Sequence, residues 1–283
     1  MRPLSELGAA EARGVEAVLF DIDDTITEGG RLLEESYSAL WALERAGIRP
    51  VPVTGRPAGW CDLVARQWPV AGVVGENGAF AFYMAAGKLE RMFHPAAPDP
   101  GATRTRLAEL GAEALAAFPG LRLAKDQGYR LFDVALDFAE EEPDLGLEIA
   151  KAVKAFCEDR GAAAKVSSIH VNAWFGAYDK LSMSELFLSR VLGLDPEKAP
   201  ASVLFFGDSP NDEPMFKRFP LACGVANVRR YASMMRFPPA FVTELPFGYG
   251  FAEGAAELLR LRKSGSERAN SGEAPLTKPS GSL

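Results

Sequence analysis

Short apolar runs alternate with amphipathic segments along the first eighty residues, and each run ends in a polar turn. The runs at 15–20, 48–53 and 70–74 have the length and β-branched content of strands. Between them, residues 34–46 place their apolar side chains on one face, and a second helical segment surrounds Trp60. The order strand, helix, strand, helix, strand predicts a parallel, doubly wound sheet.

The middle of the chain has a different pattern. Two strand-like runs, 79–84 and 88–93, flank Ala85-Ala86-Gly87, which predicts a hairpin. Helical and strand-like segments then alternate, and together they indicate an inserted α+β module over residues 80–178. These segments are a helix ending near 118, a strand at 131–138, a helix at 145–159 and a strand at 165–175.

Parallel-sheet character returns after this module, with a helix at 181–192 and a strand at 203–206. Shorter strands are expected at 221–225 and 240–243. We therefore expect an α/β protein with a doubly wound, Rossmann-like core, formed by residues 1–79 and 179–263, and an inserted α+β cap, residues 80–178. The tail, 264–283, is rich in Ser, Gly, Glu and Pro, and we expect it to be disordered.

Composition narrows the class of protein and its partners. Among the 283 residues, 48% are hydrophobic and 24% charged, as in ordinary globular proteins. The net charge of −7 and the lack of a basic run argue against a nucleic-acid partner. No apolar stretch is long enough to span a membrane, so no membrane partner is expected. Cys61, Cys157 and Cys223 are odd in number and widely spaced, which favours reduced thiols and a cytoplasmic protein. The sequence leaves the oligomeric state open.

Two acidic clusters follow apolar strands that lie far apart in the sequence. Asp21 and Asp23 come directly after the first strand, and Asp208 and Asp212 follow the run at 203–206. An acidic turn that caps a helix is the ordinary explanation of one such cluster. If the two strands are parallel neighbours, however, both clusters meet at the carboxyl edge of one sheet. Their carboxylates would repel one another unless a divalent cation neutralised them, which predicts a Mg²⁺ site for phosphate chemistry.

These residues can be given roles in phosphoryl transfer. The Asp21 carboxylate can attack phosphorus without an activating base, and Asp23, two residues on, can exchange protons as the general acid/base. We expect Thr54 and Lys180 to hold the phosphoryl oxygens. Backbone N–H groups near Asp24 and at Gly55 would assist them.

The same turns supply the expected metal ligands. Asp208 would complete a Mg²⁺ shell with Asp21 and the backbone carbonyl of Asp23. Asp212 would orient Lys180 or a metal-bound water, and Asn211 of the same turn is a further candidate ligand.

Four motifs, in order, resemble those of the haloacid dehalogenase (HAD) superfamily of phosphatases. They are Asp21-Ile22-Asp23-Asp24-Thr25, Thr54-Gly55-Arg56, Lys180 and Gly207-Asp208-Ser209-Pro210-Asn211-Asp212. The insertion between the second and third motifs is similar to the large cap of subfamily IIB, which includes Cof-like, sucrose-phosphate and mannosyl-3-phosphoglycerate phosphatases. The resemblance implies an aspartyl-phosphate intermediate, Mg²⁺ dependence and selection of the substrate by the cap. It also implies that Asn77 faces the substrate, although Asn-Gly is an ordinary turn signal too. Arg56 is a second substrate-contact candidate, or else an exposed charge.

The sequence thus predicts a Mg²⁺-dependent phosphatase acting on a small phosphorylated metabolite, most simply a sugar phosphate. One alternative is a phosphomutase acting on a hexose phosphate. That reaction needs basic residues clustered in the cap, and Arg122, Lys125, Arg130 and Lys165 are scattered along the sequence. The other alternative is a non-catalytic binding protein that retains the fold. Both Asp21 and Asp23 are present, which argues against it.

Overall fold

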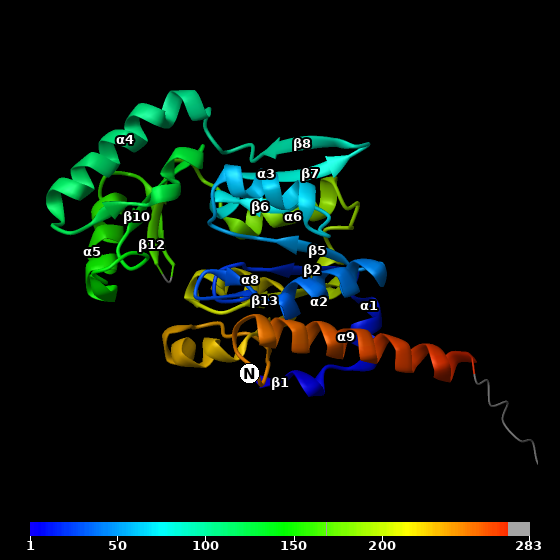
Figure 1. Cartoon of the computed structure of the whole chain (residues 1–283). Coiled ribbons are helices and arrows are strands. Elements are labelled where there is room, and N and C mark those ends of the chain that lie inside the picture. The colour runs from blue at the N-terminus through cyan, green and yellow to red at the C-terminus, as the bar shows by residue number, and fades with distance from the viewer. Residues whose placement is uncertain (168, 271–283) are drawn as a thin grey trace, which may run out of the picture.

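A parallel six-stranded sheet forms the centre of the molecule (Figure 1). The computed structural model describes residues 1–167 and 169–270. Strand order is β1-β15-β14-β13-β2-β5, and each neighbouring pair is parallel. The predicted α/β class is therefore confirmed. The strands are β1 (Arg2–Pro3), β2 (Ala17–Phe20), β5 (Arg49–Pro52), β13 (Val203–Gly207), β14 (Leu221–Gly224) and β15 (Phe241–Val242).

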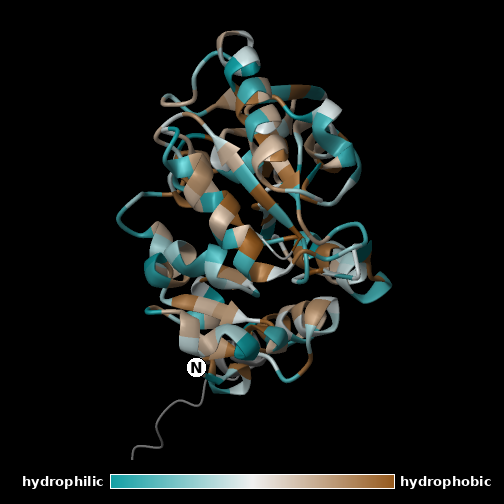
Figure 2. Cartoon of the chain, turned by 90° about the vertical axis from the view of Figure 1, so that its left-hand side faces the viewer, coloured by the Kyte–Doolittle hydropathy of each residue, from teal (hydrophilic) through white to brown (hydrophobic). Residues whose placement is uncertain are grey.

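Both faces of this sheet are buried, and β2 shows how the sequence achieves it. Its residues are all apolar and alternate between faces: Val18 and Phe20 join one hydrophobic cluster, whereas Ala17 and Leu19 join another. The first cluster is covered by α1 (Ala9–Gly14), α2 (Glu34–Arg45) and α9 (Phe247–Asn270). The second is covered by α6 (Lys180–Arg190), α7 (Ala199–Ser202) and α8 (Glu213–Arg218). The hydropathy colouring in Figure 2 shows brown segments gathered on the inner strands and helix faces.

Two prolines lie in β5 without breaking its pairing to β2. Arg49 and Val53 donate their backbone N–H groups to Glu16 and Phe20 of the β2 side. Pro50 and Pro52 occupy the alternate positions, where an N–H would point away from β2, so no ladder hydrogen bond is lost on that side. The strand consequently delivers Thr54 to the sheet edge, where its N–H donates to the carbonyl of Val74 at 2.9 Å.

The expected hairpin at 80–93 is present, but it packs with the core. β6 (Val73–Gly75), β7 (Phe80–Ala85) and β8 (Lys88–Phe93) form one antiparallel sheet, which Val53 and Val74 join to the end of β5 by a single parallel bridge. The sequence places this hairpin in the inserted module, because hairpins with interleaved helices are typical of an α+β fold. In the structure α3 (Ala58–Gln67) covers the sheet that contains it. Whether residues 80–178 form a domain of their own stays a prediction.

The cap is an antiparallel sheet covered by two helices, α4 (Pro100–Ala117) and α5 (Gly146–Glu158). Its strand order is β11-β12-β10-β9. The single strand expected at 165–175 is wrong: this stretch contributes two strands, β11 (Ala163–Val166) and β12 (His170–Trp174), which pair antiparallel. Ser167 and Ile169, between the two strands, line a pocket to which core residues also contribute. The other strands are β9 (Arg122–Leu123) and β10 (Asp133–Asp137).

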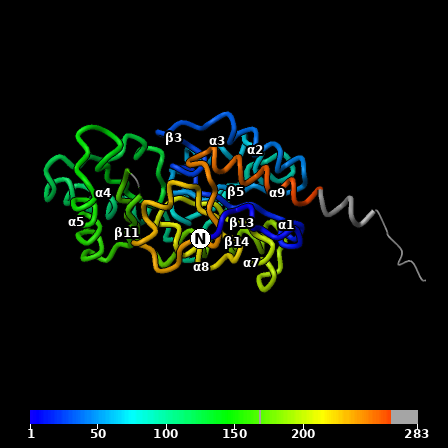
Figure 3. Tube along the Cα trace, turned by 90° about the horizontal axis from the view of Figure 1, so that it is seen from below, coloured from blue at the N-terminus to red at the C-terminus, as the bar shows by residue number. Residues whose placement is uncertain are grey.

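The cap and the end of α9 lie on opposite sides of the core, as the views from the front and from below both show (Figures 1 and 3). α9 continues to Asn270 and so includes residues 264–270 of the expected tail. The rest of the expected tail, 271–283, lies outside the described residues. Across residues 1–167 and 169–270, no helix combines the length and apolar character needed to cross a membrane.

Candidate active site

Asp21 stands at the carboxyl end of β2, the strand between β5 and β13. Its backbone N–H donates to the carbonyl of Phe206 at 3.0 Å, so the strand pairing continues up to this residue. The chain then turns tightly, and Asp24 adopts a φ of 57°, a left-handed conformation that Gly, Asn and Asp tolerate best. A small hairpin, β3 (Thr27–Glu28) and β4 (Arg31–Leu32), follows the turn. The Asp21 carboxylate is consequently fixed at the sheet edge, with only 5% of the residue exposed.

Asp208 and Asp212 lie beside Asp21 because β13 is the neighbour of β2. Ligand oxygens of the three carboxylates all lie within 4.8 Å of one another. Asp212 folds back over the end of β13, where its Oδ2 accepts the N–H of Asp208 at 3.2 Å. Gly207 makes this possible, since a Cβ there would come within 2.5 Å of Asp212 Oδ2. The sequence prediction that the two acidic clusters meet agrees with this geometry.

Lys180 provides a positive charge within this cluster. It opens α6 directly after its N-cap, Asp179, and its Nζ donates to Asp21 Oδ1 at 2.7 Å and to Asp212 Oδ1 at 3.1 Å. Burial lowers the pKa of Lys180, but the two carboxylates outweigh this effect and hold the pKa above its ordinary value. Burial raises the pKa of Asp21 to about 7, although Lys180 opposes the change. Burial and the neighbouring Asp212 also raise the pKa of Asp208.

The donor set fits a hard divalent cation. Three carboxylates and one ammonium leave a formal charge of −2 in a nearly dry site, and carboxylate oxygens are the ligands that Mg²⁺ prefers. Asp21, Asp208 and Asp212 could hold such an ion. Asp21 and Asp208 line a small cavity between the core and the cap, and Asn211 lines it too. Asn211 Oδ1 accepts the Ser209 hydroxyl at 2.9 Å.

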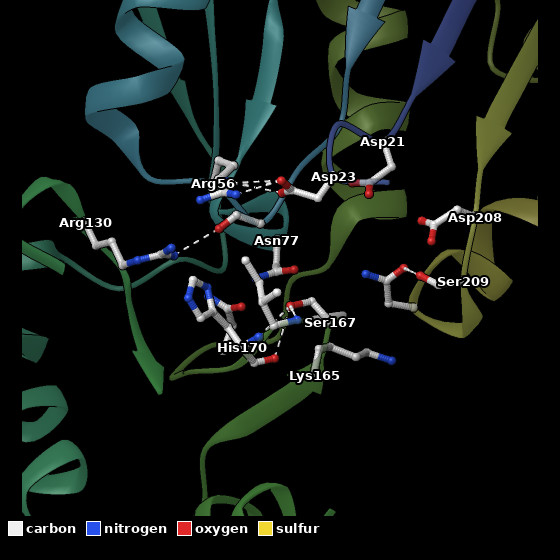
Figure 4. Close-up of a pocket in the computed structure, with 14 residues that line it drawn as sticks. Asp21, Asp23, Arg56, Asn77, Arg130, Lys165, Ser167, His170, Asp208 and Ser209 are labelled. Carbon is white, nitrogen blue, oxygen red and sulfur yellow. Dashed lines mark hydrogen bonds and ion pairs between the residues drawn. The ribbon is translucent and has the colours of Figure 1, made fainter. Parts of the chain in front are cut away.

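Asp23 is held by Arg56 in a two-pronged ion pair. Arg56 Nε lies 2.9 Å from Asp23 Oδ2, and Nη2 lies 2.7 Å from Oδ1 (Figure 4). Such a bidentate pair fixes the plane of the carboxylate as well as its position. Arg56 is 6% exposed, so the reading of this residue as an exposed charge is wrong.

Thr54 follows β5 and Asn77 follows β6; both are buried, and the Asn77 N–H donates to the Thr54 carbonyl at 3.1 Å. The Thr54 hydroxyl oxygen accepts the N–H of Arg56 at 3.0 Å, but Thr54 is not among the residues that line the cavity. Asn77 lines the cavity beside Gly55, and within the described part of the chain its buried Nδ2 has no hydrogen-bond acceptor. An unpaired buried amide costs about 1–3 kcal/mol, so this group is suited to receive a ligand oxygen.

The cap lines the site from the opposite side, mainly with residues of β11 and β12 and of the segment around them (Figure 4). Arg130 donates to the Gly55 carbonyl at 2.9 Å, but its charge is matched by Asp126 and Asp133. Lys165 has no acidic partner among the described residues. The cavity between core and cap measures only about 30 Å³. The cap residues that line it are Arg130, Lys165, Ser167, Ile169, His170 and Asn172.

Most of the residues singled out in the sequence lie in this region. Asp21, Asp208, Asp212 and Lys180 are in direct contact or within ligand distance. Asp24 is different: its carbonyl accepts Asn227 Nδ2 at 3.0 Å, and its side chain is not part of the cavity lining. Sequence reasoning missed five of the cap residues as contributors: Ser167, Ile169, Asn172 and, as cavity cations, Arg130 and Lys165.

Comparisons with known proteins place this fold. No protein-family model and no curated protein matches the sequence. Among solved structures, a HAD/COF-like hydrolase from Plasmodium vivax is 14% identical with a TM-score of 0.67, over 89% of this chain and 98% of that one. A HAD subclass IIB sugar phosphatase is 15% identical with a TM-score of 0.59, over 87% and 100%. A sucrose-phosphatase from Synechocystis, solved with sucrose and phosphate, is 14% identical with a TM-score of 0.57, over 87% and 98%. This chain therefore has the fold of the HAD-like hydrolases.

Proposed function

We propose that this chain, with its HAD-like fold, is a Mg²⁺-dependent phosphatase that hydrolyses the phosphate ester of a small polar metabolite. The observation that carries the proposal is the cluster of Asp21, Asp208 and Asp212, whose ligand oxygens lie within 4.8 Å of one another, with Lys180 bridging Asp21 and Asp212. Its position at the carboxyl ends of adjacent parallel strands is where open α/β sheets bind ligands. Structural similarity to a sugar phosphatase and a sucrose-phosphatase supports a sugar phosphate as the substrate.

Asp21 would act as the nucleophile and Asp23 as the proton carrier. An Asp21 oxygen forms a bond to phosphorus while the bond from phosphorus to the leaving oxygen breaks, and Asp23 gives that oxygen its proton. Water then attacks phosphorus, Asp23 takes up its proton, and release of inorganic phosphate restores the Asp21 carboxylate. Lys180 stabilises the phosphoryl oxygens throughout, with Thr54 and the N–H groups near Asp24 and Gly55 assisting.

Mg²⁺ would be held by Asp21, Asp208 and Asp212, with Asn211 and the Asp23 carbonyl as further ligands. When bound, it would offset the negative charge that gathers on the transferred group. These carboxylates repel one another in its absence, and Lys180 compensates only part of their charge.

The cap would select the leaving group. Its contribution to the cavity lining is mainly polar, with amide, hydroxyl, imidazole and cationic groups, which suits a leaving group rich in hydroxyls. Asn77 would supply one further donor from the core side, because its Nδ2 is unpaired among the described residues.

Phosphate release from a panel of phosphorylated metabolites, measured with Mg²⁺ and with a chelator, tests the proposal. We expect stoichiometric, Mg²⁺-dependent release from one substrate class and at least a thousand-fold loss in Asp21→Asn, since an amide oxygen is a far weaker nucleophile than a carboxylate oxygen. Asp62→Asn is the matched control, because Asp62 is a surface residue paired with Arg66 and Arg91. Release that persists in Asp21→Asn would contradict the nucleophile. An isomerised sugar phosphate without free phosphate would identify a mutase, and tight binding without turnover a binding protein.

A further inference from the structure

The guanidinium of Arg56 lies at the seam between the core and the cap and faces carboxylates of both. On the core side, Nε and Nη2 hold Asp23 at 2.9 and 2.7 Å. On the cap side, Nη1 lies 3.7 Å from Asp126 Oδ2 and 3.6 Å from Glu140 Oε1. Trp60 also packs against this guanidinium in a cation–π contact, with its indole centroid 4.4 Å from the guanidinium carbon. One buried side chain is thus bound from both sides of the seam.

The two cap carboxylates are themselves anchored within the cap. Arg130 Nε and Nη2 hold Asp126 at 3.1 and 3.2 Å, and the same guanidinium reaches across the seam to the carbonyl of Gly55. His170 Nε2 lies 2.8 Å from Glu140 Oε2. Because these partners move with the cap, the position of the cap determines how many carboxylates surround Arg56.

The structure represents a closed cap, and a substrate requires it to open. The cavity, at about 30 Å³, has room for about two water molecules, so a phosphorylated metabolite would fit only with the cap further from the core. Opening would separate Arg56 from Asp126 and Glu140, whose contacts at 3.6–3.7 Å are long and weak. The short bidentate pair with Asp23 lies within the core and would survive.

We infer that Arg56 is a positioning residue that couples cap closure to the orientation of Asp23. When the cap closes, Asp126 and Glu140 hold Nη1 of Arg56 in place. Nε and Nη2, on the other edge of the guanidinium, then fix the Asp23 carboxylate. When the cap opens, that second anchor is lost and Asp23 is held less firmly. Proton transfer is thereby favoured only in the closed state, where bulk water is excluded. The role given to Asp23 rests on the proposed function, whereas the link between Arg56 and the cap does not.

A double-mutant cycle on turnover tests the coupling. We expect Arg56→Gln to lower kcat about 10- to 100-fold, because a misplaced proton carrier costs this much. Glu140→Gln should lower kcat about two- to five-fold, and should have no further effect in the Arg56→Gln background. In the Arg56→Lys background, as in the Arg56→Gln background, Glu140→Gln should have no effect on kcat, since an ammonium cannot bridge the core and cap carboxylates. Glu141→Gln is the control, because this neighbouring carboxylate pairs with exposed Lys125. Additive effects of Arg56→Gln and Glu140→Gln on kcat would overturn the coupling.

Distance measurements test the cap link without relying on activity. Spin labels on cysteines introduced at Lys198 of the core and Glu148 of the cap would report closure, since these side chains are 84% and 88% exposed and the native cysteines are buried. We expect Arg56→Gln and Glu140→Gln to move the distribution toward longer distances, and the double variant no further than Arg56→Gln alone. A distribution for Arg56→Gln identical to that of the wild type would overturn the inference. If the wild type releases no phosphate, the proposed function fails, and the distances still decide whether Arg56 holds the cap.

Discussion

Replacing Lys180 by Met should destabilise the protein strongly when divalent cations are absent. The variant keeps a long apolar stem but leaves Asp21 and Asp212, 5% and 0% exposed, without the ammonium that donates to both. Removing one partner of a buried ion pair typically costs about 3–5 kcal/mol, and the full range applies because Lys180 is itself only 7% exposed. Lys198→Met is the matched control: that lysine is 84% exposed and lies 4.0 Å from Asp195, so we expect a change of at most about 0.5 kcal/mol.

Urea unfolding of both variants and the wild type, in chelator and again in Mg²⁺, provides the assay. Mg²⁺ should stabilise the wild type, by about 2.7 kcal/mol when its concentration is a hundred times the dissociation constant. It should stabilise Lys180→Met by more, because the three carboxylates then carry one more uncompensated charge and attract the cation more strongly. Equal losses for Lys180→Met and Lys198→Met in chelator would refute the electrostatic reasoning. A Mg²⁺ effect no larger in Lys180→Met than in the wild type would refute the metal site.

Three further variants test separate features. Glu76→Gln should destabilise the protein by about 2–3 kcal/mol in urea unfolding. The buried carboxylate accepts the N–H groups of Ala58, Leu131 and Phe132, and the NH₂ of a glutamine would face these donors. A change below about 1 kcal/mol would contradict this reasoning. Tyr178→Phe should be neutral or stabilising by up to about 1 kcal/mol, since its buried hydroxyl has no partner among the described residues; a clear loss would point to a bound water. Lys165→Met should raise KM for the preferred substrate about ten-fold while kcat and stability stay unchanged. This exposed lysine lines the cavity and has no acidic partner among the described residues. A loss confined to kcat would contradict a role in binding.

The strands that carry the chemistry could be read from the sequence because each is uniformly apolar and stops at a polar turn. In β2 and β13 every residue is buried, which is what a central parallel strand requires and what a continuous apolar run indicates. Once two such strands are placed in one parallel sheet, topology alone brings Asp21 and Asp208 to the same edge. The cluster of carboxylates therefore follows from local pattern plus one rule of connection.

The cap side of the site could not be read in this way. Residues 163–174 have no Gly or Pro to mark a turn, so the two strands β11 and β12 looked like one. Lys165 of β11 and His170 of β12 line the same cavity because the chain reverses between them. The pairing of Arg56 with Asp23 was also hidden. The chain has 38 acidic residues, and the sequence does not show which of them lies beside a given arginine. Only the folded structure shows that Arg56 pairs with Asp23.

The balance of charge at the cavity helps to distinguish a phosphatase, which releases the phosphoryl group to water, from a mutase, which transfers it to a second hydroxyl of the sugar. A mutase must retain a bisphosphate, which needs uncompensated positive charge in the cap. Of the four basic residues that seemed scattered, the structure brings Arg130 and Lys165 to the cavity and leaves Arg122 and Lys125 paired with acidic residues elsewhere. Arg130 faces Asp126 and Asp133, so its charge is already matched. Among the described cap residues that line the cavity, Lys165 alone is left to attract a second phosphoryl group, too little to hold it through a reorientation, and we therefore expect release of phosphate to water.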